Sequence, residues 1–231
     1  MEGSTATTAS QNPVVFVSLR PWTDSRDVFG GWVAPAHHVA FVAAMLEDQL
    51  GALSRALAGF SLFVFADHDG VANVAARCGA KPLMLRKEEA STIAKLAELA
   101  TVEHGTRCIL FQADMPFMRD QDLHCLIGAA QSREVIAVLD HSMQFFNVLV
   151  FRLSSAMQDV VVRAGISSQL ASMRLRGVVP QVVQLPSLTN DIRVARDLSC
   201  DWALEETSHS KRRVVPFVQD AVRAWYSTPM W

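Results

Sequence analysis

Short apolar runs alternate with longer amphipathic segments along most of this chain of 231 residues. The apolar runs have the length of strands and are bounded by charged residues, glycine or proline, a pattern typical of buried strands. On this pattern we predict strands at residues 14–19, 60–65, 82–85, 108–111, 135–139, 148–151 and 178–184.

Segments with helical spacing lie between the predicted strands. The clearest is 39–57, in which apolar residues form one stripe, namely Val42, Met45, Leu46, Leu50, Leu53 and Leu57. Shorter helices are predicted at 70–78, 90–102, 121–130, 154–163 and 194–204. Gly79, Gly105 and Gly177 each follow a helical stretch and precede a strand, which is the place for a left-handed C-cap.

Strands that alternate with helices of this length predict an α/β fold. We expect a three-layer α/β/α sandwich around a mostly parallel, mixed sheet that is covered on both faces. No internal repeat or interdomain linker is evident, so we predict one domain at 14–208, a disordered lead at 1–13 and a C-terminal tail at 209–231. Aromatic residues in the tail, such as Trp225 and Trp231, would pack back onto the domain or form an interface, so a homodimer is plausible.

Composition narrows the classes of partner. The net charge of −2 gives no basic footprint for nucleic acid or an acidic membrane. The four cysteines form no Cys-x-x-Cys pair, and no apolar stretch approaches the roughly 20 residues of a membrane-spanning helix. We therefore expect a reduced, cytoplasmic protein with no membrane or nucleic-acid partner.

Among the sequence motifs, one aspartate is the main candidate for a functional residue. The dinucleotide-binding glycine motif, the P-loop and the hydrolase nucleophile elbow are all absent. Asp114 follows the apolar run 108–111, at the carboxyl end of a predicted strand, where ligands gather in open α/β sheets. A carboxylate there suits a divalent metal held against a phosphate, and capping of the next helix is the alternative. Asp67-His68-Asp69 also has the spacing of a ligand set, but we interpret Asp69 and Gly70 as turn and cap residues.

Several short motifs resemble one family. They are Val17-Ser18-Leu19-Arg20-Pro21, Ser25-Arg26, Phe65-Ala66-Asp67, Ala113-Asp114-Met115-Pro116, Phe146-Asn147-Val148-Leu149 and the segment 188–198. Over about residues 14–200 the chain resembles the 2-phospho-L-lactate guanylyltransferase family of coenzyme F420 biosynthesis. That family is a branch of the nucleotidyltransferases with the nucleotide-diphospho-sugar transferase (GT-A) fold.

The resemblance implies a Mg²⁺-dependent nucleotidyltransferase. Such an enzyme joins the nucleoside monophosphate of GTP to a small phosphorylated acid and releases pyrophosphate. It implies that Asp114 and Asp191 bind Mg²⁺, and that Arg20 and Arg26 stand where the family has lysines facing phosphates. Arg20, Arg26 and Asp114 are then the catalytic residues. Substrate-binding positions fall on Arg86, Asn147, Gly165, Ser168 and Arg193.

The sequence departs from the family at three places. The family's Asp-Ile-Asp reads Asp191-Ile192-Arg193 here, so a cation replaces one carboxylate, and a guanidinium would repel Mg²⁺ while attracting a triphosphate. A Gly-Thr-Asn segment that receives the acid reads Phe145-Phe146-Asn147, and the two aromatic rings would fill space that the substrate needs. The segment expected to read the base reads Ala90-Ser91-Thr92 and lacks the family's glycine.

Three functions follow from these features. The favoured one is a guanylyltransferase-like enzyme that acts on a small phosphorylated or otherwise anionic acid. Arg193 and the two phenylalanines motivate the alternative of a non-catalytic family member that acts as a binding or scaffolding subunit. A glycosyltransferase that uses a nucleotide sugar is the third. The acceptor, the nucleotide and the oligomeric state stay open.

Overall fold

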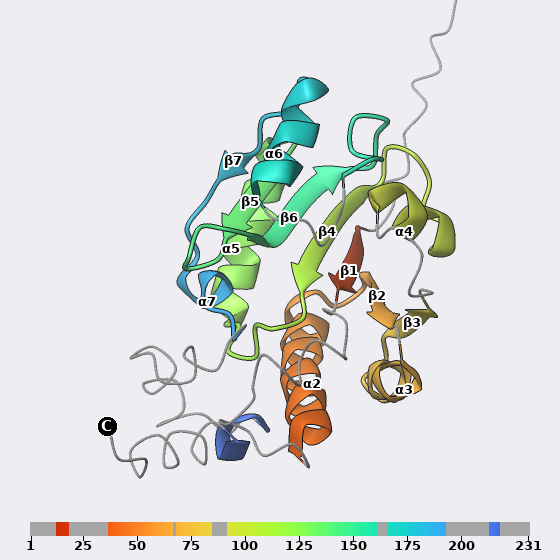
Figure 1. Cartoon of the computed structure of the whole chain (residues 1–231), viewed down its shortest axis with the longest axis vertical. Helices are drawn as coiled ribbons and strands as arrows, with labels where there is room; N and C mark the ends of the chain where they lie inside the picture. Colours follow the sequence, from red (N-terminus) through yellow and green to blue (C-terminus); the bar gives the residue numbers. More distant parts are fainter. Residues whose placement is uncertain are drawn as a thin grey trace, which may run out of the picture.

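The computed structural model describes residues 13–18, 37–66, 68–84, 92–160, 166–192 and 213–217. Within them, seven strands form one sheet in the order β3-β2-β1-β4-β6-β5-β7 (Figure 1). The strands are β1 (Val14–Ser18), β2 (Ser61–Ala66), β3 (Lys81–Met84), β4 (Arg107–Gln112), β5 (Ile136–Leu139), β6 (Phe146–Arg152) and β7 (Gln181–Val182).

The sheet is mixed and mostly parallel, as predicted. β3, β2, β1 and β4 run parallel to one another, with Val17 aligned to Val64 on one side and to Phe111 on the other. β6 runs antiparallel to both β4 and β5, and β7 is parallel to β5. The reversal arises because a short turn joins β5 to β6, and only antiparallel strands can be joined so tightly. Of the predicted strand 178–184, only Gln181 and Val182 form a strand, although the N–H of Val183 also donates to the carbonyl oxygen of Ala137 over 2.9 Å.

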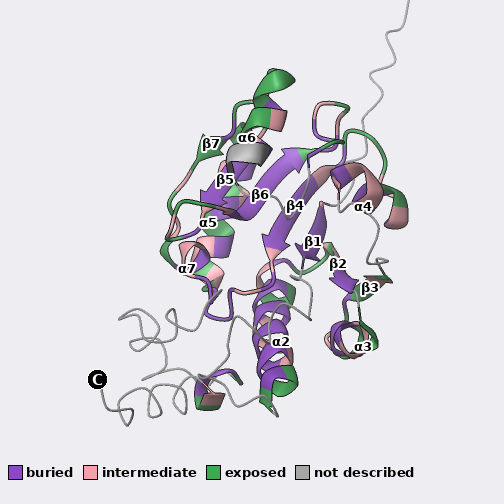
Figure 2. Ribbon diagram, viewed as in Figure 1, coloured by how far each residue is buried: buried purple, intermediate pink, exposed green. Residues whose placement is uncertain are grey.

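Helices cover both faces of the sheet, which confirms the three-layer prediction. Side chains alternate along β1, so that Val15 and Val17 pack on one face while Val14 and Phe16 pack on the other. The first face is covered by α2 (His38–Ala56), α3 (Asp69–Arg77), α5 (Asp120–Ser132) and the short α7 (Pro186–Thr189). The second is covered by α4 (Ile93–Leu99) and α6 (Ile166–Leu175) (Figure 2).

The long helix α2 has the predicted apolar stripe. All six residues of the stripe are buried, and Leu50 is fully buried. Burial of an aliphatic side chain of this size stabilises the fold by about 1.5–3 kcal/mol, so the stripe fixes α2 firmly on the sheet. α2 also positions Gln49, whose side-chain amide donates to the carbonyl oxygen of Gln112 over 2.6 Å at the end of β4.

Several predicted helices differ from the observed ones. Residues 155–159 form turns where we predicted a helix at 154–163. Ser154 and Val160 are not helical either, and residues 161–163 are outside the described residues. α6 and α7 were not predicted, because α6 has no clear apolar stripe and α7 has only four residues. The predicted helix 194–204 lies outside the described residues.

Two of the three predicted glycine caps are confirmed. Gly79 and Gly177 follow helices with φ of 78° and 74°, in the left-handed region that glycine adopts without strain. Gly105 has φ of 89° but lies in a later turn before β4. The left-handed residue after α4 is Thr101, which follows the C-cap Ala100 and has φ of 52°.

Part of the predicted tail packs back onto the domain. Asp48 of α2 accepts hydrogen bonds from the backbone N–H groups of Arg213 and Val214, over 3.0 and 2.9 Å. The ring of Phe217 lies 5.8 Å from that of Phe41. Residues 218–231 are outside the described part of the chain. No helix among the described residues is both long enough and apolar enough to cross a membrane.

Candidate functional site

The sheet reverses its winding between β1 and β4. From β1 the chain proceeds to β2 and β3 on one side, whereas β4 pairs with β1 on the other. In open α/β sheets, ligands bind at the carboxyl ends of the strands at this point. The backbone N–H of Ala113 donates to the carbonyl oxygen of Ser18 over 3.0 Å, so the two strand ends stay paired up to Asp114. The predicted residue Asp114 thus lies, partly exposed, at this edge.

Asp191 reaches the same edge from a distant part of the sequence. The N–H of Ile192 donates to the carbonyl oxygen of Asp114 over 2.8 Å, which places the backbones of the two aspartate segments side by side. Asp191 is fully buried. Its Oδ1 lies 3.1 Å from Nδ1 of His141. The sequence paired these two aspartates only through a family resemblance, and the structure brings their segments together.

Asn147 holds the segment that carries Asp191. β6 is antiparallel to β4, so its first residues lie at the carboxyl end of β4, and Val148 pairs with Phe111. The amide nitrogen of Asn147 donates to the carbonyl oxygens of Leu188 and Thr189, each over 3.0 Å. The Asn147 side chain is fully buried. This contact is structural, and it was not predicted from the sequence.

One of the two aromatic departures lies in the core. Phe146 is buried within the hydrophobic cluster on the α4 and α6 face of the sheet. The expectation that its ring fills space needed by a substrate is therefore wrong. Strict alternation would place Phe146 with Val148 and Val150 on the other face, but the register between β5 and β6 shifts here, where Leu139 pairs with Phe146 and Val138 with Val148. Phe145 is partly exposed, at the end of the turn before β6.

The turn between β5 and β6 is built around a buried aspartate. Oδ1 of Asp140 accepts hydrogen bonds from the N–H groups of Gln144 and Phe145, over 2.7 and 2.9 Å. The hydroxyl of Ser142 also donates to Asp140. His141 follows Asp140 directly and is part of the site that the sequence analysis missed. An aspartate after a strand with a serine two residues later is a turn signal, but nothing local pointed to the contact with Asp191.

A cavity of about 330 Å³ lies beside this turn. One wall comes from the end of β5 and the turn, including His141 and Met143. The other comes from the segment between β7 and the end of α7, including Gln184 and Asn190. The lining mixes aliphatic and hydrogen-bonding side chains without lysine or arginine, so it offers no fixed cation for a phosphate.

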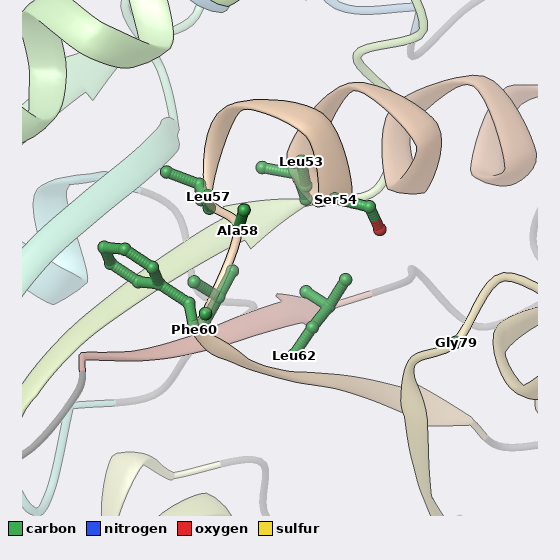
Figure 3. A pocket seen from close by; sticks show the side chains of 9 residues that line it. Leu53, Ser54, Leu57, Ala58, Phe60, Leu62 and Gly79 are labelled. Atoms are coloured by element: carbon green, nitrogen blue, oxygen red, sulfur yellow. The ribbon is translucent and has the colours of Figure 1, made fainter.

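A second, smaller cavity lies at the opposite end of the sheet. Its volume is about 140 Å³, and Figure 3 shows it between the end of α2 and the start of β2. Leu53, Leu57 and Leu62 contribute side chains to its lining, and Ser54 supplies a hydroxyl. Since ligands of such sheets bind at the carboxyl ends of the strands, this cavity is a poor candidate for the functional site.

Six predicted site residues remain, and the structure describes only one of them. Ser168 falls within α6. The remaining five lie outside the described residues, namely Arg20, Arg26, Arg86, Gly165 and Arg193. In the Asp67-His68-Asp69 segment, His68 caps α3 by accepting a hydrogen bond from the N–H of Gly70 over 2.9 Å. The segment does begin a helix, but the assignment of Asp69 and Gly70 as turn and cap residues is wrong, because they are the first two residues of α3 and His68 is the cap.

The two carboxylates suit one kind of metal better than others. Among the described residues, no group of three or more His, Cys, Asp or Glu side chains converges on a metal position. A structural zinc site, which needs four protein ligands, therefore finds no support in that part of the chain. Mg²⁺ binds in proteins through one or two carboxylates, and waters and substrate phosphates supply its other ligands. Asp114 and Asp191 fit that donor set.

Comparison of the whole fold with solved structures gives matches at low sequence identity. A candidate nucleotide-diphospho-sugar transferase from Desulfovibrio desulfuricans G20 has a TM-score of 0.69 at 13% identity, covering 96% of this chain and 100% of that one. A cytidylyltransferase from Leptospira borgpetersenii has a TM-score of 0.56 at 10% identity, with 96% and 99% covered. A 4-diphosphocytidyl-2C-methyl-D-erythritol synthase has a TM-score of 0.54 at 14% identity, with 82% and 96% covered.

At these identities the likeness establishes the fold alone. The chain has the α/β fold of nucleotide-diphospho-sugar transferases and cytidylyltransferases, as the sequence predicted. No protein-family model matches the sequence, and the comparison with curated proteins finds no significant match.

Proposed function

We propose that this chain is a nucleotidyltransferase that transfers a nucleoside monophosphate from a nucleoside triphosphate to a small phosphorylated or anionic acid. Pyrophosphate is the second product, and GTP is the favoured nucleotide. The observation that carries the proposal is the hydrogen bond from Ile192 to Asp114, which joins two carboxylate-bearing segments at the switch point of the sheet. The solved structures that share this fold include one described as a cytidylyltransferase and one described as a candidate nucleotide-diphospho-sugar transferase.

In this proposal the acceptor phosphate attacks in line. An oxygen of the acid's phosphate forms a bond to the α-phosphorus of the nucleotide, and the bond from that phosphorus to the bridging oxygen breaks. Asp114 and Asp191 would hold Mg²⁺, which neutralises charge on the triphosphate and the departing pyrophosphate. The protein contributes position and electrostatics, since such transfers need little covalent chemistry from side chains.

We assign arginine side chains to the phosphates from their positions in the sequence. Arg20 and Arg26 follow the end of β1, and Arg193 follows Asp191 by two residues. A guanidinium donates two parallel hydrogen bonds to a phosphate, so arginine at these positions suits an anionic substrate. Arg86, Gly165 and Ser168 complete the proposed substrate contacts.

Asn147, predicted to bind substrate, is fully buried, and in this proposal it supports the site from within the fold. Its amide holds the carbonyl groups of Leu188 and Thr189, directly before the Asp191 segment. By fixing that backbone, Asn147 supports the position of the Asp191 carboxylate relative to Asp114. Preorganised ligands of this kind lower the cost of binding a metal–nucleotide complex.

A non-catalytic binding subunit is the second candidate. Full burial of Asp191 and its contact with His141 favour it, because a carboxylate engaged by an imidazole is less accessible to a nucleotide complex. Replacement of the family's second late carboxylate by Arg193 points the same way.

Pyrophosphate release separates the two candidates. The purified chain is incubated with Mg²⁺, each of the four nucleoside triphosphates, and phosphoenolpyruvate, 2-phospholactate or 3-phosphoglycerate. We expect release with one nucleotide and one acid, and its loss in Asp114→Asn. Asp159→Asn is the matched control, because it removes an exposed carboxylate that pairs with Arg176 on the surface. Absence of release and of nucleotide binding across the panel would favour the binding subunit.

A further inference from the structure

The contact between His141 and Asp191 joins an accessible side chain to a fully buried one. The His141 side chain is 30% exposed and the Asp191 side chain 0%. A carboxylate that binds a metal is ionised and can only accept hydrogen bonds, so in the metal-binding state Nδ1 of the imidazole carries the proton and donates it to Oδ1, which lies 3.1 Å away. The contact therefore fixes both the orientation of the ring and the rotation of the carboxylate.

The donor is presented from a fixed backbone. Asp140, directly before His141, is buried and accepts hydrogen bonds from the N–H groups of Gln144 and Phe145. A further hydrogen bond from the N–H of Met143 to the carbonyl oxygen of Asp140, over 3.0 Å, closes the same turn. Because the turn is held at several points, little conformational freedom is lost when His141 engages Asp191.

We propose that His141 is a positioning residue that sets the orientation of the Asp191 carboxylate for metal binding. This inference rests on the proposed function, in which Asp191 is a metal ligand. Hydrogen bonds from outside the ligand set hold metal-binding side chains in the productive orientation, and their loss weakens metal affinity by about 10- to 100-fold. Asn147 fixes the backbone before Asp191, and His141 fixes the carboxylate itself.

Binding of Mn²⁺, followed by electron paramagnetic resonance with and without GTP, tests this role. We expect His141→Ala to weaken Mn²⁺ binding by about 10- to 100-fold. His141→Asn should restore most of it, because the asparagine amide nitrogen occupies nearly the position of Nδ1. His141→Gln should not, because its amide nitrogen lies one bond further along the side chain. His124→Ala, at an exposed position on α5, is the matched control.

A double-mutant cycle shows whether His141 acts through Asp191. If it does, His141→Ala has no further effect on Mn²⁺ affinity once Asp191→Asn is present. A merely structural role would weaken binding in both backgrounds, and would not separate His141→Asn from His141→Gln at equal thermal stability. If His141→Ala fails to fold, that Asn–Gln comparison decides the question.

The outcomes distinguish the two proposals. Wild-type protein that binds no Mn²⁺ contradicts the metal site of the proposed function, and the His141 role falls with it. Wild-type protein that binds Mn²⁺ with unchanged affinity in His141→Ala overturns the His141 role alone. Weakened binding in His141→Ala, recovery in His141→Asn and no added effect in Asp191→Asn support the role.

Discussion

Asn147→Ala tests how the Asp191 segment is held in place. The substitution removes two donated hydrogen bonds of 3.0 Å, to the carbonyl oxygens of Leu188 and Thr189. Asn147 and Leu188 are both buried, so water cannot easily replace the lost donors. A buried polar group left without its partner costs about 1–3 kcal/mol, and the Thr189 carbonyl is only partly buried. We therefore expect about 2–4 kcal/mol of destabilisation.

Urea denaturation measures this cost. The midpoint should fall while the m-value stays unchanged, because the area exposed on unfolding is nearly the same. Asn73→Ala, at an exposed position on α3, is the control and should change stability by no more than about 0.5 kcal/mol. If Asn147→Ala has the same free energy of unfolding as this control, the two hydrogen bonds donated by Asn147 do not stabilise the fold and the reasoning is refuted. The same variant should also weaken binding of the metal–nucleotide complex under conditions where it stays folded.

Three further predictions concern the fold. Burial raises the pKa of the Cys108 thiol to about 12, whereas Cys125 is exposed. In thiol labelling of the native protein, Cys125→Ser should therefore remove one reactive thiol and Cys108→Ser should remove none. Equal labelling of both variants would contradict that assignment. Asp48→Ala should expose the 213–217 segment to proteolysis, because it removes the acceptor of two backbone N–H groups, and unchanged cleavage would refute this docking contact. Gly79→Ala should destabilise the protein by about 1 kcal/mol because of its φ of 78°. Gly128→Ala, inside α5 with open space around it, should instead stabilise the protein by up to about 1 kcal/mol. Thermal unfolding compares the two variants, and equal shifts in melting temperature would contradict the argument from backbone conformation.

The strands and the long helix could be predicted because their signals are local. An apolar run of strand length is buried whichever neighbour it pairs with, and the stripe of α2 is set by its own sequence. The placement of Asp114 followed from the same rule, since a residue directly after a parallel strand lies at the ligand-binding edge. The antiparallel β6 and the four-residue α7 were harder, because pairing direction and very short helices depend on the rest of the fold.

The candidate site was predicted only in part, for a physical reason. His141 and Asp191 are 50 residues apart in the sequence, and a lone histidine after a strand carries no sign of its partner. Phe146 was expected to obstruct a substrate, but it packs into the core where the pairing of β5 and β6 shifts register. Site residues that are brought together by tertiary contacts can therefore be identified only from the fold, whereas residues at the end of a strand can be predicted from the sequence.

The measurement that tests the central claim most directly is calorimetric titration of GTP in the presence and absence of Mg²⁺. The claim is that Asp114 and Asp191 form a metal–nucleotide site at the switch point of the sheet. We predict Mg²⁺-dependent binding to the wild-type chain, its loss in Asp114→Asn, and unchanged binding in Asp159→Asn. Binding that keeps its Mg²⁺ dependence in Asp114→Asn would contradict the account.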